Sequence, residues 1–320
     1  MSFLDVSVGD VRMVLSKGWK MAVAGETGSG KTTLLKTIGG LAQAEKGRVV
    51  FEGQRVLGPL EKLVPGHPGI AYLSQQFELP QHLRIEQVLE YANELPEEEA
   101  LELFRVCQID HLMKRKTHQL SGGERQRIAL AKLLIASPRL LLLDEPFSNL
   151  DMIHKEVLKS VIRDIGRRLD ITCMLVSHDP LDVLSWADEI LVLREGKVVQ
   201  QGAPMQVYQA PVNEYVAGLF GKYNLIDGRI VRPEQIGIIS GEPSGALKGQ
   251  GEGAWSGKEE GTVKGEREGV LKGKVEAVSF WGSFYEVVVL ADTGMRLTVR
   301  VWANGVTTGD VVYLSLPVRS

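Results

Sequence analysis

The stretch KMAVAGETGSGKTTLL, residues 20–35, decides the fold of the first part of the chain. A short apolar run precedes the glycine-rich segment and a helical pattern follows it, so we expect a strand, a loop and a helix in that order. Backbone N–H groups of such a loop face a phosphate at the helix N-terminus, and the lysine reaches the terminal phosphates. The stretch therefore predicts a phosphate-binding loop in an α/β protein. The residues expected to bind the nucleotide phosphates are Gly25, Gly28, Ser29, Gly30, Lys31, Thr32 and Thr33.

The composition is that of an ordinary globular protein. The chain has 320 residues, of which 44% are hydrophobic and 24% charged, and its formal net charge is -3. This length favours two domains, and the charge gives no reason to expect a polyanionic partner. No apolar run approaches the roughly 20 residues of a membrane helix, and the N-terminus does not resemble a secretory signal. Cys107 and Cys173 lie outside any metal or redox spacing, which indicates two reduced, buried thiols.

Up to about residue 221 the chain has the texture of an α/β sheet protein. Apolar runs such as RLLLLDEP and ITCMLVSHD alternate with helical patterns, as in the centre of a parallel sheet. After residue 77 the apolar residues recur at three- and four-residue spacing, and Pro96 with the acids after it opens a helix. We therefore expect a helical insert at about 77–140.

A different texture begins after Leu225. Glycine recurs at every fourth position from Gly241 to Gly273, in tetrads filled with Glu and Lys. Glycine at this spacing is also typical of packed membrane helices, but the charges and the helix-weakening glycines favour a flexible low-complexity insertion at about 240–273. From Leu271 onward, short alternating runs predict a small antiparallel barrel.

Two adjacent acids close the buried strand candidate RLLLLDEP. Asp144 is expected to complete the magnesium shell with Thr32, usually through water. Glu145 stands where a carboxylate can polarise an attacking water as general base. The alternative is that both acids only cap a helix, and the four leucines before them and the glycine loop upstream argue against it.

Helicases of one large group also use a GETGSGKTT loop, but their acidic box ends in histidine, whereas this chain continues as DEPFSNLD. The deciding stretch is LSGGERQRIALA, residues 120–131. With it, the sequence from the glycine loop to Gly221 resembles the ATP-binding-cassette ATPases. The resemblance implies catalytic roles for Glu145, His178, Gln75 and Lys31, and magnesium contacts from Thr32, Gln75 and Asp144. It also implies nucleotide contacts from the signature residues Ser121, Gly122 and Gly123 and from the D-loop residue Asp151.

The signature residues stand at the start of a helix, where they form a second anion site. The resemblance implies that this site grips the γ-phosphate of ATP held by another subunit, so that ATP and Mg²⁺ are sandwiched in a homodimer. For His67, His111, His118 and His154 we expect structural roles only. The family also stacks an aromatic residue on adenine, and the residues alone assign this role to neither Phe3 nor Trp19.

The tail resembles the accessory oligomer-binding barrel of importer ATPases for ferric iron, polyamines, sulfate, molybdate or sugars. From Lys222 onward the chain carries twelve Lys and Arg and twelve Asp and Glu, which disfavours nucleic acid. The predicted fold is therefore an α/β P-loop NTPase cassette with a helical subdomain, residues 1–221, followed by a small all-β barrel domain, residues 222–320.

The function that the resemblance implies is ATP hydrolysis coupled to solute uptake, with ferric iron or polyamine favoured. The expected partners are a membrane permease and an extracytoplasmic solute-binding protein, and the expected location is the inner face of the cell membrane, on its cytoplasmic side. The alternative is a soluble cassette protein of translation or DNA repair. Such proteins usually carry two cassettes or a long coiled coil, and this sequence has neither.

Overall fold

The computed structural model describes residues 2–75, 79–91, 93, 95–148, 150–239, 269–303 and 305–317. By its internal contacts the chain divides into two compact units, Met1–Val212 and Asn213–Ser320. Among the described residues, no helix has the length and apolar character needed to cross a membrane.

A six-stranded sheet forms the centre of the first unit, in the order β10-β9-β3-β8-β7-β6. The pairs among β3, β6, β7, β8 and β9 are parallel, and β10 pairs antiparallel with β9 at the edge. The middle strands β7 and β8 are buried along their whole length, which explains their continuous apolar sequences. The six strands are β3 (Lys20–Ala24), β6 (Ile70–Leu73), β7 (Leu140–Asp144), β8 (Thr172–Val176), β9 (Glu189–Arg194) and β10 (Lys197–Gly202).

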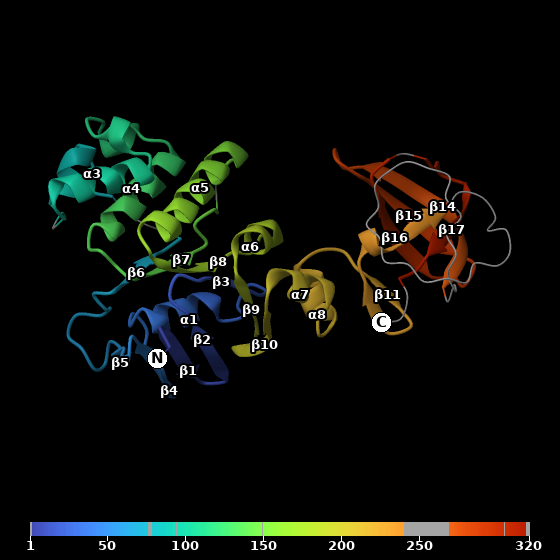
Figure 1. Ribbon diagram of the computed structural model, residues 1–320, viewed down its shortest axis with the longest axis horizontal. Coiled ribbons are helices and arrows are strands. Elements are labelled where there is room, and N and C mark those ends of the chain that lie inside the picture. The colour runs from blue at the N-terminus through green and yellow to red at the C-terminus, as the bar shows by residue number, and fades with distance from the viewer. Residues whose placement is uncertain are drawn as a thin grey trace. The chain divides into compact units, whose positions relative to one another are not determined.

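A second, antiparallel sheet has the order β2-β1-β4-β5. Its strands are β1 (Leu4–Val8), β2 (Val11–Leu15), β4 (Gly47–Phe51) and β5 (Gln54–Arg55). Helix α1 (Lys31–Ile38) buries Leu34, Leu35 and Ile38 in a core that both sheets share. Because this core holds α1 from two sides, it fixes the position of the glycine loop that precedes the helix (Figure 1).

The helical insert between β6 and β7 contains α2 (Ile85–Glu90), α3 (Glu97–Val106) and α4 (Gly122–Leu134), with 3-10 turns at Asp110–Leu112 and Thr117–Gln119. As the sequence predicted, Pro96 stands at the N-cap of α3. Helix α5 (Met152–Arg168) packs against α3 and α4, and α4 also packs on β6 (Figure 1). The remaining helices of this unit are α6 (Pro180–Trp186) and α7 (Pro204–Gln209).

The second unit is a curled, all-antiparallel sheet in the order β13-β17-β14-β15-β16, consistent with the small β domain that the sequence predicted. Its apolar faces enclose one core that includes Val287, Val299 and Leu314. The strands are β13 (Gly237–Ile239), β14 (Val270–Phe280), β15 (Tyr285–Ala291), β16 (Arg296–Val301) and β17 (Val311–Ser315). They are preceded by α8 (Glu214–Leu219), a hairpin of β11 (Asn224–Ile226) and β12 (Arg229–Val231), and the 3-10 turn Pro233–Gln235.

Two limits drawn from the sequence differ from the structure. Residues 213–221 join the second unit, because the buried guanidinium of Arg232 donates to the carbonyls of Ala217, Gly221 and Lys222. The glycine tetrads at 241–268 lie outside the described residues. Residues 271–273, where the predicted insertion and the predicted strands overlapped, belong to β14, and Val270 to Gly273 pair with β17.

Candidate nucleotide site

The glycine loop connects β3 to α1, as predicted. Lys31 is buried, and its Nζ donates to the carbonyl oxygens of Gly25 and Glu26, each at 2.8 Å. Burial lowers the pKa of Lys31, although the charges of Glu145 and Asp144 act in the opposite direction. The ammonium group is therefore held inside the loop by two carbonyls, and a bound phosphate would offer it a stronger, charged acceptor.

Within the described part of the chain, the loop has hydrogen-bond donors without a protein partner. Helix α1 begins after Gly30 with no side-chain cap and no acid in its first turn, so its first N–H groups are open to an anion. The buried Oγ of Ser29 has no hydrogen-bond partner among the described residues. Gly25 is required by close approach, since a Cβ there would lie 2.3 Å from the carbonyl oxygen of Leu193. These features fit a phosphate group.

Asp144 lies at the end of β7 and contacts the loop directly. Its Oδ1 accepts a hydrogen bond from Thr32 Oγ1 at 3.0 Å, and its Oδ2 accepts one from the hydroxyl of Tyr72 at 2.8 Å. Burial and this bond to Asp144 raise the pKa of Tyr72, which keeps the phenol a donor. In the described part of the chain, no three His, Cys, Asp or Glu side chains converge as a metal cage. A hydroxyl and a carboxylate nevertheless suit Mg²⁺, which takes its other ligands from phosphates and water.

Glu145 and His178 form a hydrogen-bonded pair beside this site. Nδ1 of His178 lies 2.8 Å from Oε2 of Glu145. Glu145 has a positive φ of 50°, a backbone conformation that non-glycine residues adopt uncommonly. Both residues line a cavity of about 270 Å³ together with Gln75. The structure thus brings these three predicted catalytic residues into one cavity.

The signature residues contact a different partner, α5. Ser121 caps α4: its Oγ accepts from the N–H of Glu124 at 3.2 Å, and its own N–H donates to the Glu124 carboxylate at 2.8 Å. Asp151 caps α5 by accepting from the N–H of His154 at 2.9 Å. The imidazole of His154 lies between the two caps, 2.7 Å from the Asp151 carboxylate and 3.5 Å from the Ser121 hydroxyl.

A buried carboxylate connects α5 to the loop that carries His178. Asp182, only 1% exposed, lies 2.8 Å from Lys155 Nζ and 2.9 Å from Lys159 Nζ. Lys155 also pairs with Asp179, the residue after His178. Burial by itself lowers the pKa of Lys155, but its hydrogen bonds to the two aspartates outweigh burial and raise it. The start of α5 is therefore held rigidly against the Glu145 and His178 side of the site.

Comparison with known proteins agrees with this geometry. Residues 8–148 match the family model described as ABC transporter. The chain is 35% identical over 240 residues to the sulfate/thiosulfate import ATP-binding protein CysA of Mycobacterium tuberculosis, a match that covers 73% of this chain and 67% of that protein.

The chain belongs to the ABC transporter ATPase family.

Other members of the family give similar matches. CysA of Bacillus cereus is 36% identical over 232 residues, which cover 69% of this chain and 64% of that protein, so the match spans about two thirds of such relatives. Among solved structures, cbiO1 of Clostridium perfringens, part of the ABC transporter complex cbiONQ, aligns with a TM-score of 0.56 at 25% identity over 64% of this chain and 90% of that one. The ATP-binding cassette MJ0796, in a dimeric post-hydrolysis state with ADP and Pi, aligns with a TM-score of 0.52 at 26% identity over 62% and 90%.

Several features of this ABC cassette were missed or left open by sequence reasoning. Tyr72 and Asp182 carry no motif of their own, and only the sheet and the α5–α6 contact reveal their roles. Phe3 is buried against Phe51, with ring centroids 5.1 Å apart, so it is not available to an adenine ring, whereas Trp19 is 45% exposed. The expectation for the cysteines is confirmed: Cys107 and Cys173 are free and buried, and burial raises the pKa of each thiol to about 12.

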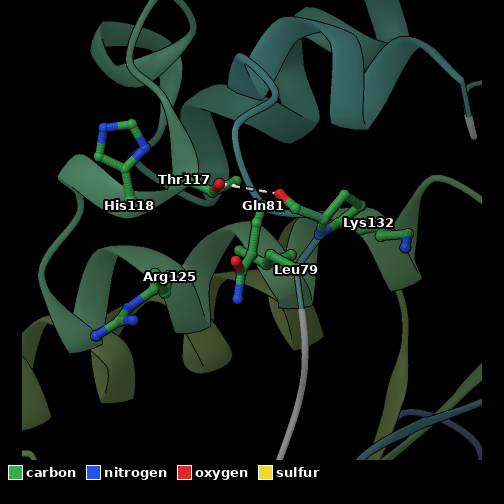
Figure 2. A pocket seen from close by; sticks show the side chains of 7 residues that line it. Leu79, Gln81, Thr117, His118, Arg125 and Lys132 are labelled. Atoms are coloured by element: carbon green, nitrogen blue, oxygen red, sulfur yellow. Dashed lines mark hydrogen bonds between the residues drawn. The ribbon is translucent and has the colours of Figure 1, made fainter.

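A second cavity of the cassette, about 750 Å³, lies on the helical insert (Figure 2). Its lining combines apolar and basic side chains: Leu79, Pro80, Gln81, Thr117, His118, Arg125 and Lys132. Thr117 Oγ1 donates to the carbonyl of Pro80 at 2.9 Å, which joins its two walls. Arg125 and Lys132 belong to α4, the helix that begins at the signature.

Proposed function

We propose that this chain is the ATP-hydrolysing subunit of an ABC importer. The observation that carries this proposal is the pair of Glu145 and His178 at the end of β7, next to the loop that holds Lys31. A carboxylate beside the terminal phosphates serves a nucleotide that is hydrolysed rather than merely bound. The name of the MJ0796 cassette structure, a post-hydrolysis state with ADP and Pi, also supports ATP hydrolysis.

In the proposed reaction the oxygen of a water attacks the γ-phosphorus as the bond to the β-phosphate oxygen breaks, and ADP departs with that electron pair. Glu145 takes the proton of the water, which passes on to the products. His178 holds Glu145 through the 2.8 Å contact and orients the carboxylate. Lys31 and the uncapped N–H groups of α1 bind the phosphates. Thr32 and Asp144, with Gln75 from the cavity wall, would hold Mg²⁺, which supplies neutralisation of phosphate charge.

The active form in this proposal is a homodimer. The N-terminus of α4 with Ser121, Gly122 and Gly123 is a second anion site, and we assign it to the γ-phosphate bound by the other copy. Asp151, at the cap of α5, would lie at the same interface. Support comes from the dimeric MJ0796 structure, whose name states both the dimer and the products.

For the solute, we propose a small oxyanion of the sulfate or thiosulfate class. The preference for ferric iron or polyamine finds no support, because the named relatives at 35 to 36% identity are sulfate/thiosulfate import proteins. Solute contacts belong to other subunits, so the assignment of the solute rests on these relatives.

The proposed partners are a membrane permease, which would hold the chain at the inner face of the membrane, and an extracytoplasmic solute-binding protein. We assign the permease contact to the cavity on the helical insert (Figure 2). Arg125 and Lys132 line this cavity from α4, so a partner seated there would push directly on the helix that carries Ser121.

The test is affinity purification of the chain from detergent-solubilised membranes of its source, with the co-purifying proteins identified by mass spectrometry. A multi-span permease is the expected result, and uptake of radiolabelled sulfate by the recovered complex in vesicles then tests the solute. Recovery from the soluble fraction with ribosomes or nucleic acid would overturn the importer proposal in favour of the soluble-cassette alternative.

A further inference from the structure

His154 connects the two motifs that the dimer proposal places at the subunit interface. Its Nδ1 lies 2.7 Å from Asp151 Oδ2, and its Nε2 lies 3.5 Å from Ser121 Oγ. The first distance is that of a strong hydrogen bond to a charged acceptor, and the second is at the long end for a hydrogen bond. Asp151 therefore holds the ring in place, and the ring presents its second nitrogen to Ser121.

The ring also packs against the backbone of the signature. A Cβ placed on Gly123 would lie 2.8 Å from Cδ2 and 3.0 Å from Cβ of His154, closer than real contacts permit. The imidazole thus occupies the space that a side chain at position 123 would need. Because 36% of the His154 side chain is exposed, the ring can still exchange a proton with solvent.

The proton on Nε2 decides what the Ser121 hydroxyl can do. The Asp151 carboxylate only accepts, so Nδ1 carries a hydrogen in either charge state of the ring. In neutral His154, Nε2 is an acceptor and attracts the hydroxyl hydrogen of Ser121. In protonated His154, Nε2 is a donor, and the hydroxyl hydrogen is released toward another acceptor. A phosphate oxygen requires such a donor.

The charged groups packed around His154 are already engaged. On α5, the second oxygen of Asp151 accepts the His154 N–H, and Lys155 is bound by Asp179 and Asp182. On α4, Glu124 accepts the N–H of Ser121 and lies 3.4 Å from Arg115. Because these groups already have partners, the change beside Ser121 when the ring gains a proton is the hydrogen-bonding role of His154 Nε2.

We propose that His154 is a positioning residue of the signature. It ties Ser121 and Gly123 to Asp151, and its protonation turns the Ser121 hydroxyl from a donor to His154 into a donor to a phosphate held by a second copy of this chain. The role rests on the proposed sandwich dimer. It predicts that ATP-driven dimerisation is tighter at low pH and weakens as the ring loses its proton.

The experiment uses the full chain carrying Glu145→Gln, which is expected to bind ATP without turnover, and compares it with Glu145→Gln combined with His154→Leu. Sedimentation velocity gives the ATP concentration for half dimerisation at about pH 6, 7 and 8, across the ordinary range of histidine. Glu145→Gln with His111→Gln is the matched control, since His111 is an exposed histidine of the same unit outside this cluster. In a separate measurement, the binding of a fluorescent ATP analogue to dilute monomer gives the nucleotide affinity of the α1 site alone.

We expect the His154→Leu variant to need about tenfold more ATP for half dimerisation at pH 6, which corresponds to the loss of roughly one charge-assisted hydrogen bond. We also expect this variant to lose the part of the pH dependence that the control retains. Monomer affinity should not change. If His154→Leu does not fold, His154→Gln, which keeps a polar side chain but cannot titrate, should still dimerise and lose the same pH dependence.

Two results would overturn the proposal at different levels. If the His154 variants dimerise with the ATP dependence and pH profile of the control, the role of His154 is wrong while the sandwich dimer stands. If Glu145→Gln itself does not dimerise with ATP at any pH, the sandwich is wrong and the role of His154 falls with it.

Discussion

Helices α1 and α4 both begin at glycine-containing turns, yet their N-termini are built differently. The N-terminus of α1 has no side-chain cap and no acid in its first turn, and the buried Lys31 beside it donates to two loop carbonyls. The N-terminus of α4 is capped by Ser121 and closed by Glu124 in a reciprocal pair. Both use the exposed N–H groups of a helix start.

The difference teaches how one chain can hold two kinds of phosphate site. The α1 site gathers a lysine and a hydroxyl from the start of α1 and two acids from the end of β7, so in our proposal it binds a nucleotide by itself. The α4 site has its cap in place, and among the described residues Ser121 bonds Glu124 of its own helix and lies near His154 of α5, neither of which is a lysine or an acid of the α1 site. In our proposal it becomes functional only when a second copy delivers a nucleotide. Changes to the α1 site should therefore abolish chemistry or binding, and changes near α4 should alter assembly.

The largest expected effect is that of Glu145→Gln at the α1 site. Loss of the general base should lower ATP turnover by about 10²- to 10⁴-fold while ATP binding persists. Phosphate release measures turnover, and Glu98→Gln, an exposed glutamate in the first turn of α3, is the matched control. Full turnover in Glu145→Gln would remove this residue from the catalytic role.

A smaller effect is expected for Lys31→Ala. Removing the ammonium group deletes charge-assisted hydrogen bonds to the phosphates and should weaken ATP affinity by about 10- to 100-fold. Calorimetric titration gives the affinity, and Lys36→Ala, an exposed lysine in the last turn of the same helix, should leave it unchanged. Equal affinities for the two variants would contradict the assignment of the loop.

The substitution Asp182→Asn tests the ion pairs that hold the start of α5 against the Glu145 and His178 side of the α1 site. The change leaves Lys155 and Lys159 without their shared buried carboxylate, so the free energy of unfolding should fall by about 3 kcal/mol. Urea denaturation measures it. Asp188→Asn removes a more exposed ion pair with Lys20 and should cost less than about 1 kcal/mol. Similar losses in both variants would mean that the buried network does not hold α5.

The smallest expected effect is the pH-dependent loss of stability when Glu124, which closes the cap of α4, is replaced; the start of α1 has no such acid. Burial raises the pKa of Glu124, but hydrogen bonds from Ser121 and the charge of Arg115 outweigh burial and lower it below its ordinary 4.5. The bonded form is the carboxylate, so its contribution is present above the unfolded-state pKa and is lost as the pH falls through the folded one. Glu124→Gln should therefore cost about 1 kcal/mol at pH 7 and progressively less below about pH 4.5.

Urea denaturation of wild type and Glu124→Gln across this pH range measures the difference. Glu99→Gln, in the first turn of α3, serves as the control for a glutamate that is not part of a capping box. A cost for Glu124→Gln that did not decrease with acid would show that the carboxylate charge plays no part in capping α4.

The α1 site was largely predictable because its residues follow one another along the chain or close a recognisable strand. Lys31 and Thr32 stand in the loop itself, and Asp144 and Glu145 come directly after four buried leucines. The surroundings of α4 were less predictable. His154 was expected to be structural, since a lone histidine carries no signal, and only the packing of α4 on α5 brings it within reach of Ser121.

The sequence by itself determined the strand, loop and helix order, the motifs and the change to a β tail, because these depend on local periodicity and on residue types close together along the chain. The tertiary structure alone decided that Tyr72 bonds Asp144, that Asp182 holds two lysines of α5, and that residues 213–221 belong with the β unit. These contacts join elements that are distant in sequence, and their partners are set by how helices pack on sheets, which no local pattern specifies.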